Sequence, residues 1–205
     1  MTQLGMQMDR LIVYQSRYGS TEEYALQLAQ DLSCRSIALE DLEAGDLAGP
    51  DQIIFGGPLR NGSIDGIKDF FKLMKQSDTL AKAAVWVTGV SAYQEEYFKA
   101  LRERDIDPQH PEVSLFYTRG RWDLSEMGFL DRQLVKTLLR SAEKRDPENR
   151  SLTEATLADV DEEPRDYTDF EYLDLIKAWA RGEEEPGIGR GTHDERLGRI
   201  VSKKA

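Results

Sequence analysis

The feature that most constrains the fold is an alternation of short apolar segments with segments of helical periodicity. Apolar runs that are typical of buried strands occur at residues 11–14, 36–39, 52–55, 83–87 and 112–118. Such an alternation favours a parallel sheet whose strands are joined by covering helices. We therefore expect one α/β domain that contains five parallel strands and carries helices on both faces of the sheet.

Helical periodicity is clearest in four segments, at residues 21–33, 64–75, 95–103 and 168–181. In the first of them Tyr24, Leu28 and Leu32 repeat along one stripe. Glycine and proline interrupt the segment 41–51, so we expect a loop or a single turn there. The third strand is expected to stop at Gly56-Gly57-Pro58.

Two segments lie outside this alternation. Residues 119–165 form an insertion after the fifth strand, in which 129–139 is an amphipathic helix and 144–164 is charged and expected to be mobile. Residues 182–205 are rich in Gly, Glu, Lys and Arg and are expected to form a flexible tail. The predicted organisation is therefore one domain over residues 1–181, followed by this tail.

Composition excludes several function classes. The formal net charge of −11 argues against nucleic acid as a partner, because phosphate contacts need a basic stripe. The acidity suits a positively charged partner or serves solubility alone, and both remain open. Cys34 is the single cysteine, which is consistent with a reducing cytoplasm, and neither His110 nor His193 has a second ligand at metal spacing. We expect no metal site and no apolar signal segment.

The strongest indication of a ligand is the loop between the first strand and the first helix. A phosphate there would meet free backbone N–H groups and the positive end of the helix dipole. Ser16, Ser20 and Thr21 add hydroxyl donors, and Gly19 permits a tight turn. The alternative interpretation is an ordinary helix N-cap, in which Ser and Thr are favoured for their own sake.

Two other phosphate motifs are excluded. The sequence contains no GxxxxGK[ST], so there is no lysine of the kind that binds nucleoside triphosphates. The run Gly187-Ile188-Gly189-Arg190-Gly191 resembles part of a dinucleotide-binding motif, but no strand precedes it. We interpret that match as chance.

At this loop the sequence resembles the flavodoxins, whose first loop reads T/S-x-T/S-G-x-T. The matching residues are Ser16, Gly19, Ser20 and Thr21, with one extra residue before the glycine. That spacing is more similar to the menaquinone-dependent protoporphyrinogen oxidase branch of flavodoxin-like proteins. Three further stretches resemble the same branch, at residues 56–62, 129–136 and 167–171, and the resemblance covers about residues 10–181.

The resemblance implies a flavodoxin-like three-layer sandwich with strand order 2-1-3-4-5 and a non-covalently bound FMN. It implies that the FMN phosphate is held by Ser16, Arg17, Tyr18, Gly19, Ser20 and Thr21. The flavin ring near N5 would be bordered by Pro58, Leu59, Arg60, Asn61 and Gly62. The pyrimidine side would be bordered by Thr88, Gly89, Val90 and Ser91 to Tyr93.

Some of these residues have alternative roles. Tyr93 either stacks on the ring or is a partly buried surface tyrosine. Arg60 either pairs with the cofactor or a substrate carboxylate, or has no role. Asn61 stands where an aromatic residue is expected. Trp122, just after the fifth strand, either covers a substrate pocket or anchors the insertion.

The resemblance implies a redox protein, acting as an electron carrier or as an FMN-dependent oxidoreductase that oxidises protoporphyrinogen IX in heme biosynthesis. Its partner would be a redox protein or a small molecule of quinone or porphyrin type. The apolar stripe of residues 129–140 either packs on its own domain or makes a peripheral membrane contact at the inner membrane face. The alternative function is a scaffold or sensor that has lost FMN.

Overall fold

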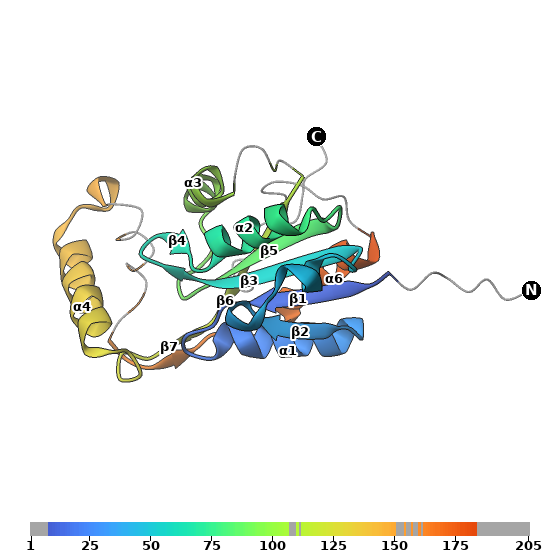
Figure 1. Ribbon diagram of the computed structural model, residues 1–205. Coiled ribbons are helices and arrows are strands. Elements are labelled where there is room, and N and C mark those ends of the chain that lie inside the picture. Colours follow the sequence, from blue (N-terminus) through green and yellow to red (C-terminus); the bar gives the residue numbers. More distant parts are fainter. Residues whose placement is uncertain are drawn as a thin grey trace, which may run out of the picture.

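The protein is an α/β sandwich in the computed structural model, which describes residues 8–106, 110, 112–150, 154, 157, 160 and 162–183. Its main sheet has the parallel strands β1 (Arg10–Tyr14), β2 (Arg35–Ala38), β3 (Gln52–Arg60), β5 (Lys82–Gly89) and β6 (Ser114–Arg119). Their spatial order is β2-β1-β3-β5-β6 (Figure 1). The predicted fold class and strand order are confirmed.

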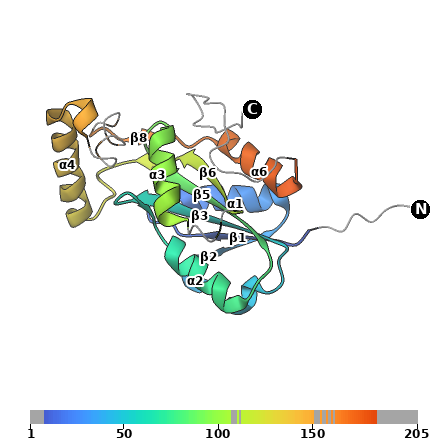
Figure 2. The same cartoon turned by 90° about the horizontal axis from the view of Figure 1, so that it is seen from above.

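Helices cover both faces of this sheet. One face is covered by α1 (Ser20–Leu32) and α6 (Leu173–Arg181), and the other by α2 (Ile67–Ser77) and α3 (Glu95–Asp105) (Figure 2). The alternation of side chains along each strand divides the core into two apolar clusters. In β1, Leu11 and Val13 join the cluster under α2 and α3, and Ile12 joins the cluster under α1 and α6.

The third strand is longer than predicted. The expectation that β3 stops at Gly56-Gly57-Pro58 is wrong, because β3 continues to Arg60 and pairs with β5 as far as Pro58 opposite Thr88. The proline is tolerated because β1 has already ended opposite Gly56. A Cβ on Gly56 would lie 1.9 Å from the ring of Trp86. This glycine is therefore needed for packing and does not mark the end of the strand.

A β-hairpin follows, and the sequence analysis did not anticipate it. Strand β4 (Ser63–Ile64) pairs antiparallel with the end of β3. The two residues between them, Asn61 and Gly62, have φ values of 50° and 75°. Positive φ at both positions is what a type I′ turn requires, and Asn-Gly is a favoured sequence for it. Helix α2 consequently begins at Ile67, later than expected.

Other elements differ only in their ends. The 41–51 crossover contains the short 3-10 helices η1 (Leu39–Asp41) and η2 (Ala44–Leu47), as the glycine pattern indicated. The last helix is preceded by the 3-10 helix η4 (Phe170–Tyr172). A small second sheet, β7 (Arg121–Trp122) paired with β8 (Arg165–Asp166), closes the insertion at its base and was not predicted.

The insertion has an apolar cluster of its own. Helix α4 (Phe129–Lys144) lies beyond the carboxyl ends of the strands in both views, and the 3-10 helix η3 (Pro147–Asn149) follows it (Figures 1 and 2). Within 144–164, which was expected to be charged and mobile, Glu154, Leu157 and Val160 are buried. They are buried because this segment supplies the partners for the apolar face of α4. Residues 184–205 of the predicted tail lie outside the described residues, and the domain limit at residue 181 stays a prediction.

Candidate functional site

The loop after β1 leads directly into the first turn of α1. Gly19 is the N-cap residue of α1 and has φ 86°, a left-handed conformation that glycine adopts without strain. No side chain caps the first turn of α1, so its N–H groups remain available to a ligand. The Ser16 hydroxyl is buried and has no hydrogen-bond partner among the described residues. Thr21 is also buried beside the same loop.

Two arginines, Arg17 and Arg121, lie beside this loop, and both are held by carboxylates. Arg17 Nε donates to Asp65 at 2.7 Å. Arg121 pairs with Glu23 and, at 3.1 Å, with Asp166. These bonds, led by those to Asp65 and Asp166, raise the pKa of each guanidinium above its ordinary value. The positive field that remains for an anion therefore comes largely from the helix terminus and its amides.

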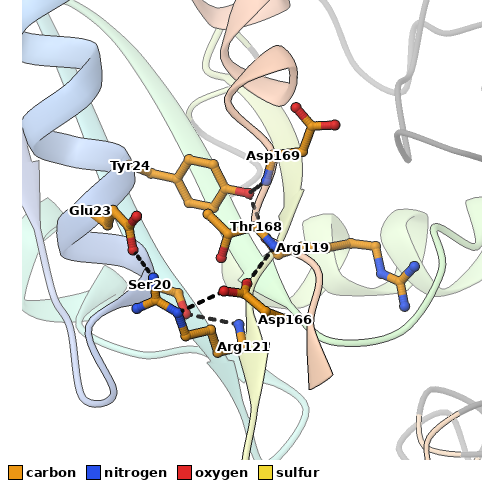
Figure 3. A network of polar contacts seen from close by, with 8 residues as sticks. All are labelled: Ser20, Glu23, Tyr24, Arg119, Arg121, Asp166, Thr168 and Asp169. Atoms are coloured by element: carbon orange, nitrogen blue, oxygen red, sulfur yellow. Dashed lines mark hydrogen bonds and ion pairs between the residues drawn. The ribbon is translucent and has the colours of Figure 1, made fainter. Parts of the chain in front are cut away.

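The predicted phosphate loop, residues 15–19, and the start of α1 are anchored to the chain segments on either side of the insertion (Figure 3). The backbone N–H of Arg121 donates to Ser20 Oγ at 2.9 Å. The Tyr24 hydroxyl donates to the Arg119 carbonyl at 2.6 Å and accepts from the Asp169 N–H at 2.9 Å. Burial raises the pKa of Tyr24 well above its ordinary value, so the hydroxyl keeps its proton. These contacts fix the start of α1 relative to β6 and β8.

A cavity runs from this loop along the carboxyl ends of β3, β5 and β6. It is lined by most of the predicted site residues, namely Ser16, Arg17, Tyr18, Ser20, Thr21, Pro58, Leu59, Arg60, Asn61, Gly62, Thr88, Gly89, Val90 and Ser91. Gly19 lies in the turn itself. The crevice at the carboxyl ends of the strands is where open α/β sheets bind ligands.

Tyr93 is the predicted site residue that does not reach the cavity. Its side chain is 6% exposed and packs edge-on against Phe98 and Tyr117, with ring centroids 5.3 and 6.0 Å apart. A tyrosine in this position buries a large apolar ring under α3, which stabilises the core. Burial also raises the pKa of Tyr93 above its ordinary value. Stacking of Tyr93 on a flavin ring does not fit this geometry.

The insertion forms the opposite wall of the cavity. Asp131 on α4 accepts from Arg60 Nη2 at 2.9 Å and from the Tyr18 hydroxyl at 3.4 Å, so it connects the hairpin with the phosphate loop. Trp122 is buried and belongs to the apolar cluster of the insertion, so it anchors the insertion, and it also lines the cavity. The remaining wall is apolar and consists of Met127, Leu134, Val135, Leu138 and Leu157.

Sequence reasoning missed Asp131 and Arg121 as members of the site. Asp131 lies in a stretch that was recognised only as a helix, and its partner Arg60 is distant in sequence. Arg121 precedes Trp122, so its place near the mouth of the site was expected but its contacts with the start of α1 were not. In both cases the sequence shows a charged residue next to large apolar residues, which was the available indication that it lies at the edge of a pocket.

The donor set fits a ligand that has a phosphate at one end and a flat ring at the other. The unpartnered Ser16 hydroxyl and the uncapped first turn of α1 suit the phosphate. The Asn61-Gly62 turn and residues 88–91 line the same cavity and could border the ring. The sequence model of a family described as "Flavodoxin domain" matches residues 11–149. The chain belongs to the flavodoxin domain family. Membership in this family points to FMN as the cofactor.

Several solved structures are similar to this one. Two-electron reduced flavodoxin of Megasphaera elsdenii is 21% identical, with a TM-score of 0.42 over 54% of this chain and 83% of that chain. A flavoprotein in complex with FMN from Lactobacillus acidophilus is 14% identical, with a TM-score of 0.41 over 55% and 92%.

Rubredoxin oxygen:oxidoreductase of Desulfovibrio gigas is 13% identical, with a TM-score of 0.41 over 63% of this chain and 33% of that chain. At these scores the structural matches add nothing to the family assignment. No curated protein matches the sequence. Within the described ranges, no helix of this flavodoxin-domain protein has the length and apolar character needed to cross a membrane.

Proposed function

We propose that this protein binds FMN at the carboxyl end of its sheet and acts as an oxidoreductase on an apolar small molecule. The observation that carries the proposal is the buried, unpartnered Ser16 hydroxyl beside the uncapped start of α1. A buried hydroxyl without a partner is costly, and a phosphate oxygen would supply the missing bond. Bound FMN supplies electron and hydride transfer, which the side chains of the protein do not.

The chain's own residues bind and orient the cofactor. Ser16, Thr21 and the amides of the first turn would hold the phosphate, and Gly19 lets the backbone approach it closely. The Asn61-Gly62 turn would border the ring. Tyr18, Arg60 and Asp131 form hydrogen bonds across the cavity and would orient the cofactor within it.

The apolar wall supports an enzyme over a simple electron carrier. A carrier needs only a flavin and a surface on which a partner docks, whereas here α4 places Leu134, Val135 and Leu138 against the cavity. An apolar pocket with few polar groups is typical of small-molecule sites. The resemblance of residues 129–136 to the protoporphyrinogen oxidase branch implies protoporphyrinogen IX as the substrate and a quinone as the acceptor.

The exposed end of α4 supports a contact with a membrane, from which a quinone acceptor could be drawn. Phe129 and Leu130 are 73% and 80% exposed, although both are large and apolar. Exposed apolar residues of an amphipathic helix favour insertion at a membrane interface, where quinones reside. We include in the proposal a peripheral contact at the inner face of a membrane through residues 129–140.

The cofactor part of the proposal is tested by titrating the FMN-free protein with FMN. We expect stoichiometric binding and a flavin absorption spectrum. Replacing Ser16 with Ala removes a hydrogen bond to a charged group, worth about 1.5–3 kcal/mol, and should weaken binding roughly 10- to 100-fold. Ser77→Ala is the matched control, because Ser77 lies at the far end of α2 and bonds only to the Met74 carbonyl among the contacts described. A wild-type protein that binds no FMN would leave only the scaffold or sensor function.

The substrate part is tested by assaying porphyrinogen oxidation with and without a quinone. We expect activity that depends on both FMN and the quinone. Leu138→Asp places a charge in the apolar wall and should abolish oxidation while FMN affinity stays within about twofold of wild type. A protein that is reduced by a flavoprotein reductase but oxidises no porphyrinogen would be a carrier, and the substrate proposal would be discarded.

A further inference from the structure

Asp105, the last residue of α3, is a buried carboxylate outside the cavity. Its side chain is 1% exposed. Both of its oxygens accept from the Ser63 hydroxyl at 2.9 Å, and one also accepts from the Ile64 N–H at 2.6 Å. Arg104 Nε donates to it at 3.0 Å. Three donors therefore converge on one carboxyl group, and the Ser63 hydroxyl lies at the same distance from both of its oxygens.

The position is an unfavourable one for an acid. A negative charge at the C-terminal end of a helix opposes the helix dipole, and burial removes the water that would stabilise the charge. The carboxylate is tolerated because its acceptor capacity is filled by charged and neutral donors. Residues that break a local rule in this way are expected where function requires them.

Two of the donors to Asp105, the Ser63 hydroxyl and the Ile64 N–H, belong to the hairpin beside the cavity. Ser63 and Ile64 form β4 and directly follow the Asn61-Gly62 turn, which lines the cavity. The hairpin has only two residue pairs, Leu59 with Ile64 and Arg60 with Ser63. A ladder this short does not fix its own position in water, so its placement depends on tertiary contacts.

Asp105 supplies such a contact from the side of α3. On the other side, Arg17 of the phosphate loop pairs with Asp65, the residue after β4, at 2.7 Å. The Arg17–Asp65 pair is partly exposed and contributes little to the hairpin's stability. The buried bonds to Asp105 therefore restrain the hairpin before any cofactor is present, together with the buried side chain of Ile64 and the Arg60–Asp131 pair.

We propose that Asp105 is a positioning residue that holds the Asn61-Gly62 turn in the conformation that receives the flavin ring. The inference rests on the proposed function, since it assigns the turn to the ring of FMN. A turn that is already in place costs no ordering free energy when the ligand binds. Without Asp105, only part of the protein has a competent turn, and the apparent affinity for FMN falls by that fraction.

The test compares three variants of the full chain. Asp105→Asn removes the charge and sets an amide N–H against the hairpin donors, Ser63→Ala removes one donor without changing any charge, and Asp69→Asn is the control. Asp69 is exposed on α2 close to the hairpin in sequence. We expect FMN affinity to fall about tenfold in Asp105→Asn and about threefold in Ser63→Ala, as the loss of one or more hydrogen bonds implies, and to stay unchanged in Asp69→Asn.

Two further readouts separate positioning from global stability. Amide hydrogen exchange in the FMN-free protein should speed up over residues 61–66 in both hairpin variants and remain unchanged in the strands. The potential of bound FMN should shift in Ser63→Ala, which carries no change of charge, and should stay at the wild-type value in Asp69→Asn. If Asp105→Asn does not fold, Ser63→Ala alone decides the question.

The outcomes also distinguish this inference from the proposed function. If wild type binds no FMN, the proposed function fails and the assignment of Asp105 to a flavin site fails with it, whatever the exchange data show. If wild type binds FMN while both hairpin variants bind it equally well, with unchanged exchange and potential, the positioning role is overturned and the proposed function stands.

Discussion

Replacement of Tyr24 with Phe tests whether one hydroxyl holds helix α1 to the two chain segments that flank the insertion. The Tyr24 hydroxyl donates to the Arg119 carbonyl at 2.6 Å and accepts from the Asp169 N–H at 2.9 Å. Phenylalanine keeps the ring and its edge contact with Phe170 but leaves both backbone groups without this partner. Two lost bonds of about 1–1.5 kcal/mol each predict a loss of about 2–3 kcal/mol in the free energy of unfolding.

Urea unfolding of the FMN-free protein, followed by circular dichroism, measures this loss. We expect a lower midpoint with an unchanged slope, and a melting temperature about 4–12 °C below wild type. Tyr18→Phe is the control, because Tyr18 is 36% exposed and its hydroxyl contacts Asp131 at 3.4 Å. That variant should stay within about 0.5 kcal/mol of wild type. A Tyr24→Phe protein no less stable than the control would refute the reasoning.

Two more predictions concern packing and pH. Gly56→Ala places a Cβ 1.9 Å from the Trp86 ring and should lower the free energy of unfolding by about 3 kcal/mol or more. Gly45→Ala is the control, because a Cβ there meets nothing within 4 Å and should leave stability unchanged. Thermal denaturation compares the two variants, and equal melting temperatures would contradict the packing argument. Burial acts to raise the pKa of Asp166, but hydrogen bonds from the backbone N–H two residues on and from Arg121 outweigh it and hold the pKa below its usual range. Asp166 therefore stabilises the fold above its unfolded pKa of about 3.9, so the stability difference between wild type and Asp166→Asn should be present at neutral pH and vanish as the pH falls through the lowered value. A difference that is the same at pH 7 and pH 3 would show that the ion pair is irrelevant.

The parallel sheet could be predicted because its strands are buried on both faces. Runs such as Ile53 to Phe55 have no polar residue and are therefore easily recognised. The extension of β3 to Arg60 could not be recognised in the same way. Glycine and proline usually end strands, and only the ring of Trp86, from a different strand, explains why Gly56 is needed there.

The hairpin was overlooked although its signal was present. Asn61-Gly62 is a strong turn sequence, but a resemblance to a flavin loop led us to view Asn61 as a missing aromatic. The prediction lacked the partner strand, since β4 has only two residues and no apolar alternation. Its anchor, Asp105, is distant in sequence and could not be identified without the fold.

The parts of the candidate site that depend on local sequence could be located in advance, whereas those that depend on tertiary contacts could not. The loop at Ser16 to Thr21 follows from a strand, a glycine and a helix that are adjacent in the chain. Tyr93 was misplaced because the side to which a loop aromatic turns is decided by the core it meets, here Phe98 and Tyr117. Asp131 joins the site through an ion pair with a residue far away in sequence.

The separate apolar cluster of the insertion has an evolutionary consequence. Trp122, Leu139 and Val160 pack with one another and not with the two clusters of the sheet. Substitutions within this cluster can therefore accumulate while the two apolar clusters of the sheet keep their packing. A family can thus keep its cofactor site and change its substrate through mutations in one peripheral segment of the chain.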